Sequence, residues 1–155
     1  MLITRIRPGE QAVETEAPTA GAGPGLPDRA VLDFAGGLPG FPGARGFRLE
    51  MLAPEYGPFF LMRSVDQAEI CFVVTVAGAL FPEYTVTIDE QHVASLGLAS
   101  VDDAVVLCII TLGERPTANL LGPLVVNRQT QAAAQVVQYE SGYRASEPLA
   151  PRSEP

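Results

Sequence analysis

Short apolar segments separated by turn residues recur along this chain and predict β-strands. Residues 31–34, 47–52 and 59–65 have the length of strands, and glycines and prolines lie between them. Residues 84–88 alternate apolar and polar side chains, which is typical of a strand with one face in water. Residues 70–76 and 104–112 are almost continuously apolar, which indicates strands buried on both faces. The shorter segments predicted as paired edge strands are residues 2–6 and 11–15.

One segment predicts a helix. Asp89 can accept hydrogen bonds from the first free amides, Val93 and Leu96 share one face, and Gly97 can end the last turn. A second capping motif spans residues 100–103 and predicts one more helical turn before the long apolar segment. The helix is long enough to cover one opening of a sheet.

Residues 117–127 and 135–139 predict the last two strands. Val125 and Val126 lie between Pro123 and Asn127, so the first strand begins after a rigid turn and ends at a polar residue. The link of residues 128–134 is too short for a parallel crossover, which needs a dozen or more residues. We therefore expect an antiparallel pair.

Three stretches rich in proline and in small or polar residues predict irregular structure. Residues 17–30 carry few large apolar side chains, so we expect a flexible loop there, and we expect a disordered tail over residues 146–155. Residues 36–43 form a turn in which Leu38 and Phe41 either plug the end of the sheet or present an apolar patch to a partner. Packing considerations favour the plug.

Many short strands with one helix indicate an all-β fold. We expect a small antiparallel β-barrel-like single domain with one short helix, covering residues 1–145; a tightly curled sandwich is the alternative architecture. A chain of 155 residues, 47% of them hydrophobic, can bury a sufficient core without metal ions or disulfides.

Four motifs in this order resemble the flagellar assembly factor FliW family: LDFAGGLPGF from residue 32, EICFVVT from 69, DDAVVLCIIT from 102, and TANLLGPLVVNRQT from 117 followed by QVV. The resemblance implies a β-barrel-like binding protein of the bacterial cytoplasm, whose partners are flagellin and the RNA-binding translational regulator CsrA. It identifies residues 17–30 as an insertion. Similar proteins carry a basic tip and a glycine where residues 128–134 here are nearly uncharged and lack glycine.

The charge balance favours basic partners over nucleic acid. Ten arginines and no lysine stand against eighteen acidic residues, giving a formal net charge of −8. Such a surface repels phosphate backbones, so we expect no direct binding to nucleic acid. No segment approaches the roughly 20 apolar residues that cross a membrane. Cys71 and Cys108 lie in apolar segments, and we expect both to be unpaired core residues. We expect a cytoplasmic monomer.

Catalytic and metal-binding groups are scarce. His92 is the single histidine, and no His or Cys pair has the spacing of a zinc site. Acidic neighbours such as Asp102 and Asp103 are more simply explained as caps than as a catalytic dyad. We therefore expect neither an enzyme nor a metal or cofactor site, although a hydrolase built from carboxylates brought together by folding stays as a third option.

A partner-binding surface is the preferred functional hypothesis. It needs a sheet edge or groove with polar groups that fix register and apolar groups that supply area. The alternative, a purely structural role, is that Asn119 and Asn127 only accept hydrogen bonds from turn amides. The competing functional class is a barrel that binds a small ligand in its interior. The candidate partner-binding residues are Leu38, Phe41, Asn119, Leu120, Leu121, Pro123, Asn127, Thr130 and Gln135.

Overall fold

The computed structural model describes residues 4–6, 26, 29–52, 58–139 and 141–149. The strand expected at 11–15 and the loop expected at 17–25 lie outside these residues. The helical elements are α1 (Ala77–Leu80), α2 (Glu90–Leu96) and the 3-10 turn η3 (Val101–Asp103). The strands are β1 (Thr4–Ile6), β2 (Val31–Phe34), β3 (Gly46–Met51), β4 (Phe59–Ser64), β5 (Cys71–Val76), β6 (Val86–Ile88), β7 (Ala104–Thr111), β8 (Thr117–Ala118), β9 (Leu124–Asn127), β10 (Ala132–Gln135) and β11 (Glu147–Pro148).

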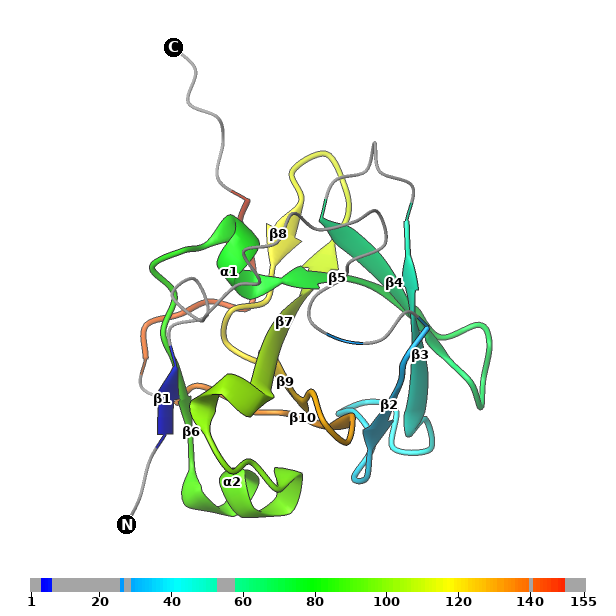
Figure 1. Ribbon diagram of the computed structural model, residues 1–155. Coiled ribbons are helices and arrows are strands. Elements are labelled where there is room, and N and C mark those ends of the chain that lie inside the picture. The colour runs from blue at the N-terminus through cyan, green and yellow to red at the C-terminus, as the bar shows by residue number, and fades with distance from the viewer. Residues whose placement is uncertain (1–3, 7–25, 27–28, 53–57, 140, 150–155) are drawn as a thin grey trace, which may run out of the picture.

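Seven strands close into a barrel in the order β7-β5-β4-β3-β2-β10-β9, and β9 returns to β7 (Figure 1). Every neighbouring pair is antiparallel except β2 and β10, which run parallel. The predicted all-β barrel is therefore confirmed. The parallel contact joins strands about a hundred residues apart, so no local pattern could predict it.

The barrel interior is filled by side chains that alternate along its strands. In β4 every second residue is buried, and β3 follows the same in-out alternation as far as Leu49. A second cluster packs outside β7 and β9, beneath β6, α2 and the C-terminal segment. Both faces of β7 are thus covered, which explains why its sequence does not alternate. The largest interior side chains are Leu32, Phe34, Phe47, Met62, Leu107 and Leu124.

Helix α2 begins and ends where the sequence predicts. The Asp89 carboxylate accepts a hydrogen bond from the His92 amide at 2.8 Å, and Gly97 closes the helix in the left-handed region with φ 67°. The capping motif at Ser100 also forms, and it starts η3. Helix α1 was not expected, because it is a single turn directly after β5 without a side-chain cap.

The second strand of the C-terminal pair lies earlier than predicted. The antiparallel pairing is confirmed, but β10 covers residues 132–135 instead of 135–139. The turn between β9 and β10 is short, because the Gln131 amide donates to the Asn127 carbonyl at 2.7 Å and Gln131 lies in the left-handed region at φ 68°. Beyond β10 the Val136 amide still donates to the Pro123 carbonyl. Pro123 has no amide to return the bond, so the ladder stays incomplete there.

Two segments expected to be irregular contain ordered, packed residues. Strand β11 pairs with β8, and the Leu149 amide donates to the Pro116 carbonyl at 3.2 Å, so residues 146–149 of the expected tail are ordered; residues 150–155 lie outside the described residues. Leu26, within the loop expected at 17–30, is only 7% exposed and belongs to the interior cluster. Burial of a large apolar side chain such as that of Leu26 is favourable enough to offset the entropy lost when that residue is ordered.

Candidate functional site

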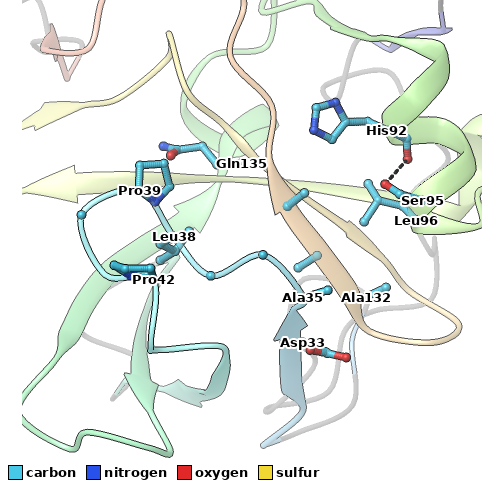
Figure 2. A pocket seen from close by; sticks show the side chains of 15 residues that line it. Asp33, Ala35, Leu38, Pro39, Pro42, His92, Ser95, Leu96, Ala132 and Gln135 are labelled. Atoms are coloured by element: carbon cyan, nitrogen blue, oxygen red, sulfur yellow. Dashed lines mark hydrogen bonds between the residues drawn. The ribbon is translucent and has the colours of Figure 1, made fainter.

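A groove of about 670 Å³ lies on the outside of the barrel where three elements meet (Figure 2). Its floor is β10, one wall is α2, and the other wall is the turn of residues 35–42 that follows β2. The lining side chains are small or apolar, with Asp33, His92 and Gln135 as the polar exceptions. In Figure 2, Gln135 and Pro39 lie at one end of the groove and Asp33 at the other.

The turn of residues 35–42 depends on glycine. Gly37 has φ 74°, and a side chain there would come within 2.6 Å of the Pro42 carbonyl oxygen. The turn sends Leu38 into the barrel interior, where it is buried, as the plug hypothesis requires. Phe41 points elsewhere: it is 38% exposed and meets the Phe72 ring edge-on at 5.7 Å between centroids. The two candidate residues of this turn therefore have different roles.

Asn127 joins the end of β9 to the end of α2. Its Nδ2 group donates to the carbonyls of Leu96 and Gly97 at 2.8 and 3.2 Å. Its Oδ1 atom accepts from the amides of Gln129 and Thr130 at 2.8 and 3.3 Å. The residue is 2% exposed. Asn127 therefore satisfies turn and helix-end groups, as the structural alternative holds.

The segment of residues 119–123 is held by similar contacts. Asn119 Oδ1 accepts from the Gly122 amide at 2.8 Å, so this asparagine also satisfies a turn amide. The Gln135 side chain donates to the Gly122 carbonyl at 2.9 Å. A Cβ atom on Gly122 would lie 2.7 Å from Gln135 Nε2, so a larger residue there would displace the end of the Gln135 side chain from this hydrogen bond. The Leu120 carbonyl accepts from the buried Tyr84 hydroxyl, and burial raises the pKa of Tyr84 far above its ordinary value.

The fold separates the nine candidate residues into buried and accessible ones. Leu38, Leu120, Pro123 and Asn127 are buried, and such side chains support the surface instead of presenting themselves to a partner. The accessible or half-buried candidates are Phe41, Asn119, Leu121, Thr130 and Gln135.

The groove brings together Leu38 and Gln135 from this set. It adds residues that sequence reasoning missed, because alanines and a helix face carry no chemical signature of their own. Those additional lining residues include Asp33, His92, Ser95 and residues 132–134.

His92, on the helix wall of the groove, is engaged in a structural contact. The His92 ring lies 2.8 Å from an Asp89 carboxylate oxygen. Partial desolvation works against ionisation of Asp89, but the hydrogen bonds from His92 outweigh it and lower the pKa of Asp89. Within the described residues, no three His, Cys, Asp or Glu side chains gather as a metal site requires.

The two cysteines differ, contrary to the expectation that both lie in the core. Cys108 is buried, and burial raises its thiol pKa to about 12. Cys71 is exposed, because it opens β5 on the outer face of the barrel. An apolar sequence neighbourhood cannot tell which face of a strand a residue occupies.

The barrel interior leaves the small-ligand hypothesis without support. Buried side chains of its strands fill it, with Phe34 of β2 and Phe47 of the neighbouring β3 packed edge-on at 5.6 Å between ring centroids. The groove described above lies outside that interior, between α2 and the turn after β2. Among the described helices, none is long and apolar enough to cross a membrane.

Relatives of known family share this chain's sequence and fold. A sequence model of the FliW protein family matches residues 24–149. The chain belongs to the FliW family. The flagellar assembly factor FliW of Bacillus licheniformis is 37% identical over 125 residues, covering 79% of this chain and 86% of that protein. That of Heliobacterium modesticaldum is 34% identical over 131 residues, covering 83% and 85%.

A crystal structure of a flagellar assembly factor FliW superposes on this FliW family member with a TM-score of 0.73 at 28% identity, covering 80% of this chain and 88% of that one. The predicted resemblance is thereby confirmed for sequence and fold. The motif of residues 117–127 forms β8, the arch of residues 119–123 and β9. Its residues hold together the region between the barrel and α2.

Proposed function

We propose that this FliW family member is a non-enzymatic binding protein of the bacterial cytoplasm that binds flagellin and a CsrA-type translational regulator in mutually exclusive complexes. Flagellin that accumulates occupies the protein; once flagellin is exported, the freed protein binds the regulator and relieves repression of flagellin synthesis. The observation that carries the proposal is the family match over residues 24–149. The relatives named above carry the name flagellar assembly factor, which supports a role with flagellar components.

The charge of the chain supports the second half of the scheme. With a formal net charge of −8, the protein attracts a cationic RNA-binding regulator and repels the RNA that competes for it. Association steered by charge depends on ionic strength, because salt screens charges beyond the Debye length, which is about 10 Å at 0.1 M and about 3 Å at 1 M. Affinity for the regulator should therefore fall as salt rises.

Calorimetric titration of the purified chain with flagellin and, separately, with the regulator tests the proposal. We expect binding to each, weaker regulator binding at higher salt, and displacement of the regulator when flagellin is added to the preformed complex. Failure to bind either protein would contradict the proposed function. A complex that holds both at once would contradict mutual exclusion, and salt-independent affinity would contradict the electrostatic contribution.

A further inference from the structure

We propose that the open edge of the chain from Gln135 to Val137, at the end of β10 and just beyond it, takes up an extended segment of a partner protein as an added β-strand. The segment would carry a basic residue at the end that reaches Asp33. The proposal rests on the proposed function, because the occupant is a segment of a bound partner. It goes further by naming the backbone edge and the chemistry of what binds there.

The hydrogen-bond pattern shows which way each backbone group points. The amides of Val136 and Gln138 donate to the carbonyls of Pro123 and Leu121 at 2.9 and 2.8 Å. Successive residues of an extended chain point their backbone groups to opposite sides. The amide and carbonyl of Val137 therefore point away from residues 121–123, and no described residue accepts or donates there.

On the side to which the Val137 backbone groups point, a described strand pairs with this segment only at the start of β10. Strand β2 pairs with β10 at Ala132 and Ala133, where the register joins them to Asp33 and Phe34. β2 then stops, because the Gly37 amide turns back to the Phe34 carbonyl at 2.7 Å and the turn of residues 35–42 leaves the sheet. An added strand would continue the line of β2 along an edge that the fold leaves open.

The surroundings of this edge suit an extended chain with small side chains. The groove beside it has a floor of small side chains, residues 132–134, and Pro39 faces Gln135 across it (Figure 2). Beyond the groove Val137 is 37% exposed and Tyr139 is 81% exposed, so apolar surface is available for packing. The open edge thus combines backbone hydrogen-bonding groups with apolar area.

The charge around the groove restricts which partner segment can bind at the open edge. Asp33 is exposed at the lower end of the groove, and the described residues offer it no ion-pair partner within 4.0 Å. The other titratable group of the groove, His92, already contacts Asp89. On a chain with net charge −8, a basic residue in the occupant is complementary to Asp33, and an acidic residue is repelled.

The decisive variant removes only the free amide of the edge. Val137→Pro deletes an N–H group that makes no hydrogen bond within the described structure, and it restricts Val136 to the extended backbone that its own bond to Pro123 already indicates. Val137→Thr is the matched control, because it has nearly the same shape and keeps the amide. Circular dichroism and thermal unfolding establish that each variant is folded.

Titration with flagellin and with the CsrA-type regulator then tests the edge. We expect Val137→Pro to weaken binding of at least one partner by about tenfold, the equivalent of about 1.4 kcal/mol, and Val137→Thr to change it less than about twofold. Asp33→Asn should weaken the same complex and reduce its salt dependence. Wild-type affinity of Val137→Pro for both partners would overturn the edge proposal and leave the proposed function standing.

An exchange measurement keeps the test valid if the proline variant does not fold. In the wild-type complex, the amide of Val137 should exchange with solvent more slowly than in the free protein, because a partner carbonyl accepts it. Unchanged exchange in a saturated complex overturns the edge proposal. A wild-type chain that binds neither partner overturns both proposals together.

Discussion

Replacement of Asn127 by alanine should destabilise the protein strongly while sparing its surface. The side chain makes four hydrogen bonds, two as a donor to the end of α2 and two as an acceptor in the turn after β9. It is 2% exposed, so water cannot replace the lost partners without rearrangement. Asn127→Ala therefore leaves backbone groups at the C-terminal end of α2 and in the turn without partners.

The expected cost follows from the number and geometry of these bonds. A net contribution of about 0.5–1.5 kcal/mol for each bond, with the two longer ones at the low end, gives about 2–4 kcal/mol. That is a large fraction of the roughly 5–15 kcal/mol by which domains are stable. With a urea m-value of about 2 kcal/mol/M, the middle of the usual range for small proteins, the unfolding midpoint should fall by about 1–2 M.

Urea unfolding followed by circular dichroism measures this change, since the chain has no tryptophan for fluorescence. Asn119→Ala is the matched control. Its Oδ1 atom accepts one hydrogen bond, from the Gly122 amide at 2.8 Å, and the residue is half-buried. We expect it to cost about 1 kcal/mol or less. Partner affinity of Asn127→Ala, measured where the variant is folded, should match wild type.

Asn127→Asp separates the donor from the acceptor role. The carboxylate can still accept in the turn, but it places negative charge beside the Leu96 and Gly97 carbonyls at the negative end of α2. The aspartate should be at least as unfavourable as alanine at neutral pH, and less so near pH ~4, where a protonated carboxyl can donate. This account of Asn127 would be refuted if Asn127→Ala cost less than about 0.5 kcal/mol, or if Asn127→Asp left the free energy of unfolding unchanged at neutral pH.

Three further predictions concern other contacts. At pH 8, where Cys108 is protonated because burial raises its pKa to about 12, a thiol reagent should label only Cys71 until the protein unfolds. Gly97→Ala should lower the free energy of unfolding in urea by about 1–2 kcal/mol, because φ is 67° at this residue. The control Gly43→Ala, at an exposed glycine without a positive φ, should leave it nearly unchanged. The lowered pKa of Asp89 implies a stabilisation that is complete above about pH 4 and lost as pH falls through the folded value. Asp89→Asn, which caps without titrating, should lack this acid-dependent loss in urea unfolding; equal pH profiles would contradict it.

Sequence patterns predicted the helix ends and the positions of most barrel strands, because interactions between residues close in the sequence control these features. The cap at Asp89, the stop at Gly97 and the capping box at Ser100 involve neighbours within four residues, so their chemistry is visible in the sequence. The strands of the barrel were located by apolar segments and turn residues for the same reason. The resemblance to the family came from four motifs in order, the one of residues 117–127 among them, because the order of short motifs can be read without knowing which strands pair.

The candidate site was only partly predictable. Asn127 and Asn119 stood out as polar residues in an apolar motif, yet the structure shows that they bind backbone groups of α2 and of their own turns. Cys71 was expected inside because its neighbours are apolar, but a shift of one residue reverses the face of a strand. The groove escaped prediction because its alanines acquire meaning only beside α2 and the turn after β2.

The sequence by itself determined the strand content, the helix ends and the family, because periodicity, capping and turn chemistry act over a few residues. Tertiary structure decided that β2 meets β10 in parallel, that β9 closes the barrel on β7, and that no described residue hydrogen-bonds the amide or carbonyl of Val137. These features arise from strand pairing between distant segments. Backbone hydrogen bonding is the same for every residue except proline, so the side-chain sequence carries little information about which strands pair.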